Sequence, residues 1–429
     1  MSTNDARRRG PAPAQDPVTG AVDVARVRAG GLDLIDTDAA LERAVALLRA
    51  GRGPIAIDAE RASGYRYSER AYLVQLYRRD SGTFLVDPLP FETLAPLAEA
   101  VPDVEWIIHA ATQDLSCLRE VGIDPELLFD TELAARLLGL PRVGLGAVVE
   151  QLLGIKLAKA HSADDWSMRP LPVEWLAYAA LDVELLVDVR DSLAELLAES
   201  GKSEIAEQEF QAVLARDLSH RREEPWRRLI GHAKLRGSRS LAVARELWTA
   251  RDEYARATDT APGRIVPDRS LSAVANELPR SRGQLAAMRS FTGRESRSQI
   301  DRWWAAIERG LETTDLPGRP LQPADHMPPH RSWEQRHPEA HARLQAARPR
   351  IQEKAEEYGM PVENLLTPDH LRRVAWQPPA PADAESIGAQ LAGLGARPWQ
   401  IEATAQVIAA AFADAGAGLV VSVDDVPAA

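Results

Sequence analysis

Segments that read as β-strands are confined to the first half of this 429-residue chain, and this division constrains its fold more than any other feature. Residues 54–58 form a short apolar run after Gly53 and predict a buried strand. Residues 72–77 and 83–86 flank a polar turn that ends in Gly82, which predicts a hairpin. An antiparallel pair followed by strand–helix alternation predicts a mixed sheet with helices packed on its faces.

The alternation continues to about residue 200. We expect a strand over residues 104–108 and a helix over 113–121 directly after it. Three further helices should follow, over residues 131–138, over 145–153 and, after Pro172, as one helix that runs through 197.

Beyond about residue 222 only helical patterns remain. The length of the chain suggests two to four domains. We expect a disordered N-terminal segment (1–30), an α/β domain (31–218), a helical domain (221–313), a linker with five prolines (314–335), a second helical domain (336–414) and a flexible tail (415–429). The two helical domains share a loose pattern, so an internal duplication and a chance likeness both stay open.

The composition is that of a soluble globular protein, with 45% hydrophobic and 27% charged residues. No apolar run reaches the roughly 18–20 residues that a membrane span needs, and the N-terminus lacks a secretory signal pattern. We therefore expect a cytoplasmic protein with no membrane partner. Cys117 is the single cysteine, which excludes an intrachain disulfide, and its leucine neighbours favour a buried core residue over a reactive thiol.

The formal net charge of −12 argues weakly against a simple nucleic-acid-binding protein. The charge is unevenly distributed, however. Residues 221–312 contain 19 Arg and Lys against 12 Asp and Glu, so this helical region carries a local positive excess. A nucleic-acid contact through the helical region is therefore compatible with the sequence.

Two carboxylates stand at the end of the first predicted strand. Asp58 and Glu60 lie at positions i and i+2, so their side chains project from the same face. A strand that is apolar on both sides does not bury two carboxylates unless a cation holds them. The alternative, that the strand ends at Asp58 and both groups are solvated, stays open from this pair alone.

Three further polar residues fall near the same predicted edge. Asp114 follows the strand at 104–108, where an ordinary helix-start aspartate is the alternative interpretation. Tyr178 and Asp182 lie at i and i+4 on a helix, a spacing that also arises by chance. Converging carboxylates would repel one another unless divalent cations neutralised them. Magnesium prefers such oxygen ligands, and two ions can activate water and stabilise a leaving oxygen.

Three segments resemble the exonuclease motifs of the DEDD superfamily, in order and at suitable distances: Ile57-Asp58-Ala59-Glu60, His109 to Leu115, and Tyr178 to Val183. A tyrosine four residues before the last aspartate is typical of one subclass, and Tyr178 occupies that position. Phe129 to Ala135, the Leu152-Leu153-Gly154 segment, and Ser162 to Leu171 are similar to the ribonuclease D family in particular.

The helical regions extend this resemblance. Residues 224–313 resemble the HRDC domain that ribonuclease D shares with RecQ-type helicases, through residues that include Trp226, Trp248, Arg251 and Pro267. Residues 336–414 resemble the second helical domain of the family. The resemblance implies an α/β ribonuclease H-like exonuclease domain followed by two all-α HRDC-type domains.

The same resemblance implies a function. We expect a 3′-5′ exoribonuclease that uses two divalent metal ions, Mg²⁺ or alternatively Mn²⁺, on RNA with a free 3′ end such as transfer RNA precursors. The metal ligands would be Asp58, Glu60, Asp114 and Asp182. Tyr178 would complete the catalytic set by orienting the attacking water or taking its proton.

The expected substrate contacts are Arg61, Gln75, His109, Gln113, His161, Asp165 and Trp166. The family commonly has a phenylalanine after the first carboxylate pair, whereas this chain has Arg61-Ala62, so its grip on the terminal base should differ. Lys156 and Lys159 are either phosphate contacts or solvated lysines. We expect the Trp303-Trp304 pair to pack between helices and not to stack on bases.

Two alternative functions remain compatible with the sequence. A DNA exonuclease would carry the same carboxylates, because recognition of the 2′-hydroxyl leaves no clear motif. A non-catalytic nucleic-acid-binding scaffold is the other alternative, and the five intact catalytic positions argue against it.

Overall fold

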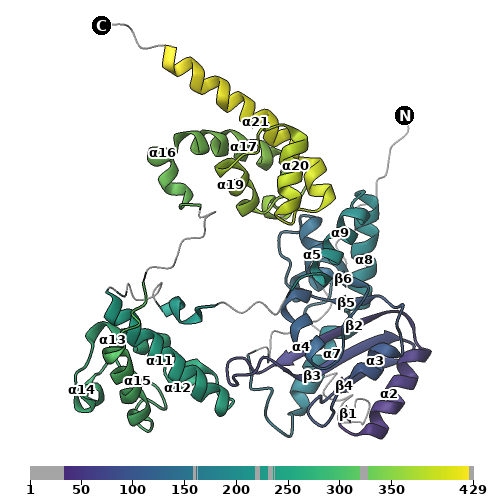
Figure 1. Ribbon diagram of the computed structural model, residues 1–429. Helices are drawn as coiled ribbons and strands as arrows, with labels where there is room; N and C mark the ends of the chain where they lie inside the picture. Colours follow the sequence, from purple (N-terminus) through teal and green to yellow (C-terminus); the bar gives the residue numbers. More distant parts are fainter. Residues whose placement is uncertain are drawn as a thin grey trace, which may run out of the picture.

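The computed structural model describes residues 33–157, 161, 163–217, 223–229, 235, 237–318 and 327–424, with side chains up to residue 416. The expectations for the lead-in at 1–30, for Lys159 and for the end of the tail lie outside these ranges. The described chain forms a mixed α/β unit, which we call the nuclease unit, and two helical units (Figure 1). Within the described ranges, no helix combines the length and apolarity required to cross a membrane.

The nuclease unit is built on a six-stranded sheet with the order β1-β4-β3-β2-β5-β6. Strands β2, β3 and β4 are antiparallel neighbours, whereas the pairs β1–β4, β2–β5 and β5–β6 are parallel. The predicted mixed sheet is therefore confirmed. The strands are β1 (Leu34–Ile35), β2 (Arg52–Arg61), β3 (Ala71–Arg79), β4 (Gly82–Val86), β5 (Trp106–Ile108) and β6 (Leu128–Asp130).

Helices flank this sheet, and α7 crosses it: it packs against β2, β3 and β4, while α8 packs against β2, β5, α5 and α6. The helical elements are α2 (Asp38–Ala50), α3 (Ala95–Glu99), η1 (Ala111–Gln113), α4 (Leu115–Glu120), α5 (Thr131–Leu137), α6 (Leu145–Leu153), α7 (Val173–Glu184), α8 (Leu186–Glu199) and α9 (Ser203–Leu214).

The single helix predicted after Pro172 is wrong in one respect, because the structure has two helices there. The break falls at Leu185, which has φ −93° and ψ −11° between α7 and α8. The two helices pack against different neighbours, and the break allows each to bury its own apolar face. No proline or glycine marks the break in the sequence.

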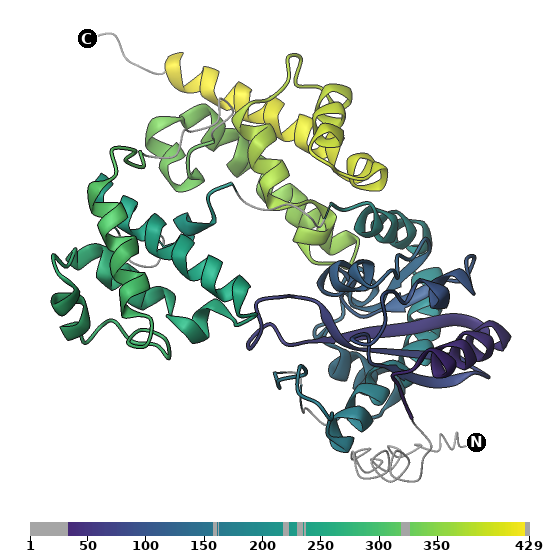
Figure 2. The ribbon, with the colours of Figure 1, turned by 60° about the horizontal axis from the view of Figure 1, so that its bottom comes forward.

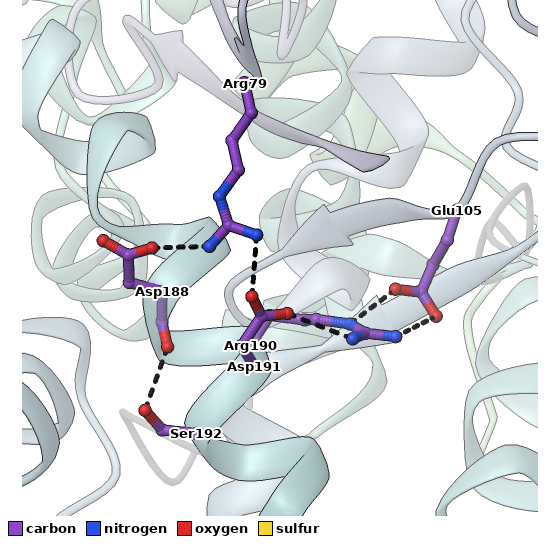
Figure 3. Close-up of polar contacts among 6 residues, drawn as sticks. All are labelled: Arg79, Glu105, Asp188, Arg190, Asp191 and Ser192. Atoms are coloured by element: carbon purple, nitrogen blue, oxygen red, sulfur yellow. Dashed lines mark hydrogen bonds and ion pairs between the residues drawn. The ribbon is translucent and has the colours of Figure 1, made fainter. Parts of the chain in front are cut away.

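A network of ion pairs fastens α8 to the sheet (Figure 3). Arg79 of β3 donates to Asp188 at 2.6 Å and to Asp191 at 2.7 Å, and both carboxylates lie on α8. Arg190 of the same helix donates to Glu105 at 2.8 Å, just before β5. The network ties one helix to two strands, so it fixes the end of α8 that follows α7.

The first helical unit contains η2 (Pro225–Arg227), α11 (Ser238–Ala257), α12 (Pro262–Ile265), α13 (Asp268–Glu277), α14 (Arg282–Ala287) and α15 (Ile300–Glu312). Trp303 is fully buried in its core, and the indole N–H donates to the Glu295 carbonyl at 2.9 Å. Trp304 is partly buried against the same core. The expectation that this tryptophan pair packs between helices is confirmed.

The second helical unit contains η3 (His330–Ser332), α16 (Trp333–Arg336), α17 (Pro338–Glu357), α18 (Val362–Leu365), α19 (Pro368–Trp376), α20 (Ala384–Gly393) and α21 (Pro398–Asp424). It repeats part of the succession of the first unit, because in both units a 20-residue helix is followed directly by a 4-residue helix. This common succession supports the duplication that the sequence left open.

Two expected boundaries of the second unit differ from the structure. The linker expected up to residue 335 ends earlier, because Trp333 starts α16 and is fully buried. Burial of the large apolar Trp333 side chain is favourable, so this residue belongs to the second helical unit and not to the linker. The tail expected from Ala415 continues α21 as far as Asp424, where alanine supplies high helix propensity despite Gly416.

Each helical unit contacts the nuclease unit at a different place (Figures 1 and 2). The second unit docks on α9, where the Arg397 guanidinium donates to both oxygens of Glu209 at 2.6 and 2.7 Å. Trp399 donates its indole N–H to the same carboxylate at 2.8 Å. Buried apolar residues of the two units form one continuous cluster, so this attachment is firm.

The first helical unit contacts the loop between β2 and β3, which extends toward it in Figure 2. Asp259 accepts hydrogen bonds from the Ser68 backbone N–H at 2.9 Å and from the Tyr67 N–H at 3.2 Å. The Arg264 guanidinium lies 3.7 Å from the centre of the Tyr65 ring. This loop follows directly on the strand that carries Asp58 and Glu60.

Candidate active site

Three of the predicted carboxylates converge at the end of β2. Asp58 and Glu60 project from the same face of this strand, and Asp182 lies on α7, which crosses that face. One ligand oxygen from each lies within 4.8 Å of the others. The expectation that the strand pair is merely solvated is wrong, because Glu60 is only 8% exposed.

Asp114 lies at the edge of the same site. It stands at the start of α4, as the helix-start interpretation has it, but its side chain makes no capping hydrogen bond. Its Oδ1 atom lies 3.2 Å from the Arg61 Nη2 atom. Asp114 therefore faces the other carboxylates with a guanidinium beside it.

These side chains line one pocket of about 870 Å³. The pocket is large enough for a nucleotide, since small-molecule sites commonly span about 300–1,000 Å³. Its lining includes all five predicted catalytic residues and also Arg61, His109, Gln113, Arg142, Glu150, Lys156 and the 144–147 segment at the start of α6. Lys156 lines the pocket 3.7 Å from Glu150, but its side chain is 62% exposed, so a phosphate contact and a solvated lysine both stay open.

Burial and mutual repulsion raise the pKa values of these carboxylates. Desolvation, followed by the charges of Asp58, Asp182 and Asp114, raises the pKa of Glu60 to about 9. Desolvation and then the negative charge of Asp58 raise the pKa of Asp114 to about 8, whereas the positive charge of Arg61 lowers it. The pKa values of Asp58 and Asp182 are also raised, chiefly by burial. Hard divalent cations fit this set of oxygen donors, because they would supply the missing positive charge.

Neighbouring groups hold Asp58 in position. The Ala59 backbone N–H donates to its Oδ1 atom at 2.8 Å, and the Gln75 side-chain amide donates to Oδ2 at 3.2 Å. Gln75, expected at the substrate, is fully buried instead, because the β2–β3 register pairs it with Asp58. Gln75 therefore positions the Asp58 carboxylate and does not line the pocket. Its own Oε1 atom has no hydrogen-bond partner within the described chain.

Tyr178 lies one helical turn before Asp182, and its hydroxyl hydrogen-bonds to that carboxylate. Burial, followed by the charges of Asp182 and Glu60, raises the pKa of Tyr178 above its ordinary range. The hydroxyl therefore remains protonated at neutral pH and can donate a hydrogen bond. This favours an orienting role over that of a base. The His161 ring lies edge-on to Tyr178, with ring centres 5.8 Å apart.

His109, which the sequence predicts as a substrate contact, is a positioned residue directly after β5. Its Nδ1 atom lies 2.9 Å from the Thr131 hydroxyl, and burial lowers its pKa to about 4. The imidazole is therefore neutral at physiological pH. It lines the pocket together with Arg61 and Gln113. Ala62, next to Arg61, is buried in the core and does not face the pocket.

Besides Gln75, three expected substrate contacts do not line the pocket, namely His161, Asp165 and Trp166. Trp166 is fully buried against Trp175, with ring centres 5.1 Å apart, and its indole N–H donates to the His161 carbonyl at 3.1 Å. Asp165 accepts hydrogen bonds from the Ser167 backbone N–H and hydroxyl. This environment buries the apolar ring of Trp166 and gives its single N–H donor an acceptor. Trp166 therefore stabilises the position of the His161 backbone.

The sequence interpretation missed the role of Asp130. This buried side chain accepts hydrogen bonds from the backbone N–H groups of Ala110 and Ala111, at 3.1 and 2.9 Å, and from those of Glu132 and Leu133, at 3.0 and 3.1 Å. It therefore caps α5 and anchors the turn before Asp114. An aspartate directly before Thr-Glu is a helix-capping signal, so the pattern was present in the sequence.

Three family models match successive parts of the chain. A 3′-5′ exonuclease model matches residues 32–198, an HRDC domain model matches 240–307, and a 3′ to 5′ exonuclease C-terminal domain model matches 326–412. The matched regions coincide with the nuclease unit, the first helical unit and the second helical unit. The Cys117 side chain is buried in the nuclease unit, as expected.

Curated relatives are similar over the nuclease unit and beyond. The chain is 35% identical to ribonuclease D of Pseudomonas paraeruginosa over 54% of this chain and 62% of the relative. It is 32% identical to ribonuclease D of Musicola paradisiaca over 59% of this chain and 69% of the relative. The chain thus spans less than two thirds of the length of the first relatives that it matches.

A solved structure extends the similarity to the helical units. Escherichia coli RNase D, described as an exoribonuclease involved in structured RNA processing, superposes with a TM-score of 0.64 at 26% sequence identity. The superposition covers 84% of this chain and 99% of the other. The arrangement of one nuclease unit and two helical units is therefore shared with that structure.

Proposed function

Because this chain belongs to the ribonuclease D family, we propose that it is a metal-dependent exoribonuclease that hydrolyses RNA from a free 3′ end. The products are nucleoside 5′-monophosphates. The observation that carries this proposal is the group formed by Asp58, Glu60 and Asp182, whose ligand atoms lie within 4.8 Å of one another in the pocket.

Asp58, Glu60 and Asp182 would hold two divalent ions, and Asp114 would complete the set of ligands at the edge of the pocket. Mg²⁺ suits an all-oxygen donor set, and Mn²⁺ is accepted by the same ligands. When bound, such ions lower the pKa of a water molecule and stabilise the leaving oxygen. Gln75 and the Ala59 N–H orient the Asp58 carboxylate for this role.

The protein's own groups position the reacting atoms. The Tyr178 hydroxyl, held by Asp182, donates a hydrogen bond that orients the attacking water. Water adds to the last phosphorus atom, the bond to the 3′ oxygen of the preceding nucleotide breaks, and that oxygen takes a proton. Arg61 binds the phosphate in place of the aromatic contact that the family commonly has, because its guanidinium lines the pocket beside Asp114.

The natural substrates are structured RNAs with single-stranded 3′ ends, such as transfer RNA precursors. Support comes from the described activity of the E. coli relative and from the positive excess of residues 221–312. Arginine-rich surfaces contact phosphates without regard to sequence.

One assay tests the proposal. Purified protein is incubated with matched RNA and DNA strands, labelled at the 3′ or the 5′ end, with Mg²⁺ or with EDTA. We expect labelled mononucleotide from the 3′-labelled RNA at once and a ladder from the 5′-labelled RNA, both lost in EDTA. Faster degradation of the DNA strand would replace the proposal by a DNA exonuclease, and no degradation of either strand would refute it.

A further inference from the structure

A second, larger groove adjoins the pocket that holds the carboxylates. It has a volume of about 1,230 Å³ and lies between the nuclease unit and the first helical unit. The same two chain segments line both cavities: Arg61 faces the pocket and Ser63 faces the groove, and likewise Gln113 and Ser116. The pocket and the groove therefore lie next to each other on the nuclease unit.

Arginines from both units line this groove, namely Arg66, Arg119, Arg216, Arg228 and Arg256. Three of them are engaged: Arg119 pairs with Asp124 at 2.7 Å, Arg256 with Asp252 at 3.0 Å, and Arg66 donates to Ser167. The side chains of Arg216 and Arg228 are exposed and form no ion pair or hydrogen bond with the described residues. Within this part of the chain, their guanidinium groups are therefore available to a phosphate.

The groove continues into a third cavity, of about 440 Å³, within the first helical unit. Arg228, Asp252 and Pro262 line both the groove and this cavity. The flat walls of the cavity come from the Trp248 ring and from Pro225, Pro262 and Pro267. Flat apolar walls of this kind suit a planar aromatic group.

Arg251 gives this cavity a polar group that is left without a partner. Its side chain is 5% exposed; Nη1 donates to the Val266 carbonyl at 2.7 Å and Nη2 lies 2.7 Å from the Asp268 carboxylate. The Nε atom, however, is buried and has no hydrogen-bond partner in the described part of the chain. Buried N–H groups are nearly always paired, so the Arg251 Nε–H is an unsatisfied donor in the wall of the cavity.

We propose that the cavity is a nucleotide-binding subsite for an unpaired base of the RNA strand, upstream of the 3′ end. The base stacks on Trp248, and Arg228 binds the adjacent phosphate. Stacking tolerates any base, which suits an enzyme that shortens strands of varied sequence. The subsite rests on the proposed function, because an upstream base is defined only for a strand whose 3′ end lies in the hydrolytic pocket.

The test is an abasic scan. A 5′-fluorescein-labelled 20-nucleotide RNA is prepared with a single abasic residue at successive positions, and its affinity for the full chain is measured by anisotropy in EDTA, which prevents hydrolysis. Loss of one stacked base lowers affinity about tenfold. We therefore expect one upstream position to stand out from its neighbours, separate from the terminal nucleotides in the hydrolytic pocket.

Variants assign that position to the cavity. Trp248→Leu keeps apolar bulk but removes the ring, and it should weaken binding of the intact strand about tenfold and abolish the distinct abasic position. Arg228→Gln is exposed, so it should fold normally, and it should weaken binding of every strand and flatten its salt dependence. The matched control, Arg289→Gln, changes an exposed arginine of the same unit that lines neither cavity.

The outcomes separate this proposal from the proposed function. An abasic scan without a distinct upstream position, or one that Trp248→Leu leaves unchanged, overturns the subsite even if the wild-type chain degrades RNA. Trp248→Phe retains a ring, so recovery of the distinct position supports stacking, and no recovery in a folded Trp248→Phe protein counts against it. Failure of the wild-type chain to cleave RNA with Mg²⁺ is a separate readout and rejects the hydrolytic function.

Discussion

At the residue scale, Asp58 is held from two sides, by the Ala59 N–H and by Gln75. The change Asp58→Asn keeps the shape of the side chain and removes its charge from the metal site. We expect RNA hydrolysis to fall by at least about 10²-fold, because a positioned catalytic group typically contributes that much. Folding should be unimpaired, since a repelling charge is lost. Single-turnover kinetics and thermal melting measure both effects, with Asp103→Asn, an exposed aspartate, as the control.

A substitution at Tyr178 tests whether the hydroxyl of this residue orients the attacking water. Tyr178→Phe keeps the ring against His161 but deletes the group that hydrogen-bonds to Asp182. We expect metal binding to survive and the chemical step to slow by about 10²-fold. Tyr77→Phe, on β3, is the matched control. A Tyr178→Phe protein that melts early but retains the full rate per folded molecule would show that this tyrosine is structural.

The raised pKa of Glu60 predicts how stability depends on pH. In EDTA the folded state holds a proton on Glu60 up to about pH 9, whereas an unfolded glutamate releases it near pH 4.5. The folded state therefore binds more protons between these values, and its stability decreases as pH rises through this window. We expect Tm in EDTA to decline from pH 5 to pH 9, and Glu60→Gln to reduce the slope.

Metal addition supplies the complementary measurement. The proposed Mg²⁺ would bind the ionised carboxylates, so its affinity should rise with pH over the same window, and its stabilising effect should be greatest at high pH. Calorimetric titration at several pH values measures this trend. A metal affinity that is independent of pH would contradict the assignment of these carboxylates as ligands.

The residues of the site differ in how far the sequence predicts them. Asp58 and Glu60 follow from the two-residue period of one strand, which is local information. Gln75 and Trp166 were expected at the substrate but are buried, because their positions depend on how one segment registers with another. Residue type shows what a side chain can bind, and only the packing shows whether it is exposed.

At the element scale, Asp130 joins α5 to the turn that carries Asp114. Asp130→Ala removes an acceptor for four backbone N–H groups. We expect the free energy of unfolding to drop by about 3 kcal/mol, since buried donors without an acceptor cost about 1–3 kcal/mol each and part of the loss relaxes. Chemical denaturation measures it. Asp124→Ala, an exposed aspartate paired with Arg119, should cost less than about 1 kcal/mol.

Strands and helices with a clear period were predictable, and short or interrupted ones were not. The strand at β2 and the hairpin of β3 and β4 carry several residues of apolar pattern with a turn that ends in Gly82. Strand β1 has only two residues, too few to show any alternation. The break at Leu185 is set by the separate packing of α7 and α8, so no local signal marks it.

At the scale of the whole molecule, Glu209 is the polar centre of the contact with the second helical unit. Glu209→Ala leaves the Arg397 guanidinium and the Trp399 indole without their acceptor. Breaking a buried pair in this way typically costs about 3–5 kcal/mol. We expect faster cleavage by a protease within residues 327–416 and a larger radius of gyration in small-angle X-ray scattering. Glu207→Ala, an exposed neighbour on α9, should leave both measurements unchanged.

The first helical unit is joined to the rest of the chain at both of its ends, by α9 on one side and by the second unit on the other, and the second unit is itself fixed to α9. If the contacts to the β2–β3 loop open, the unit therefore cannot diffuse away. Its return is an intramolecular event, governed by a high effective concentration and not by affinity in solution. Modest contacts such as those of Asp259 can thus hold this interface closed and still allow it to open and close again.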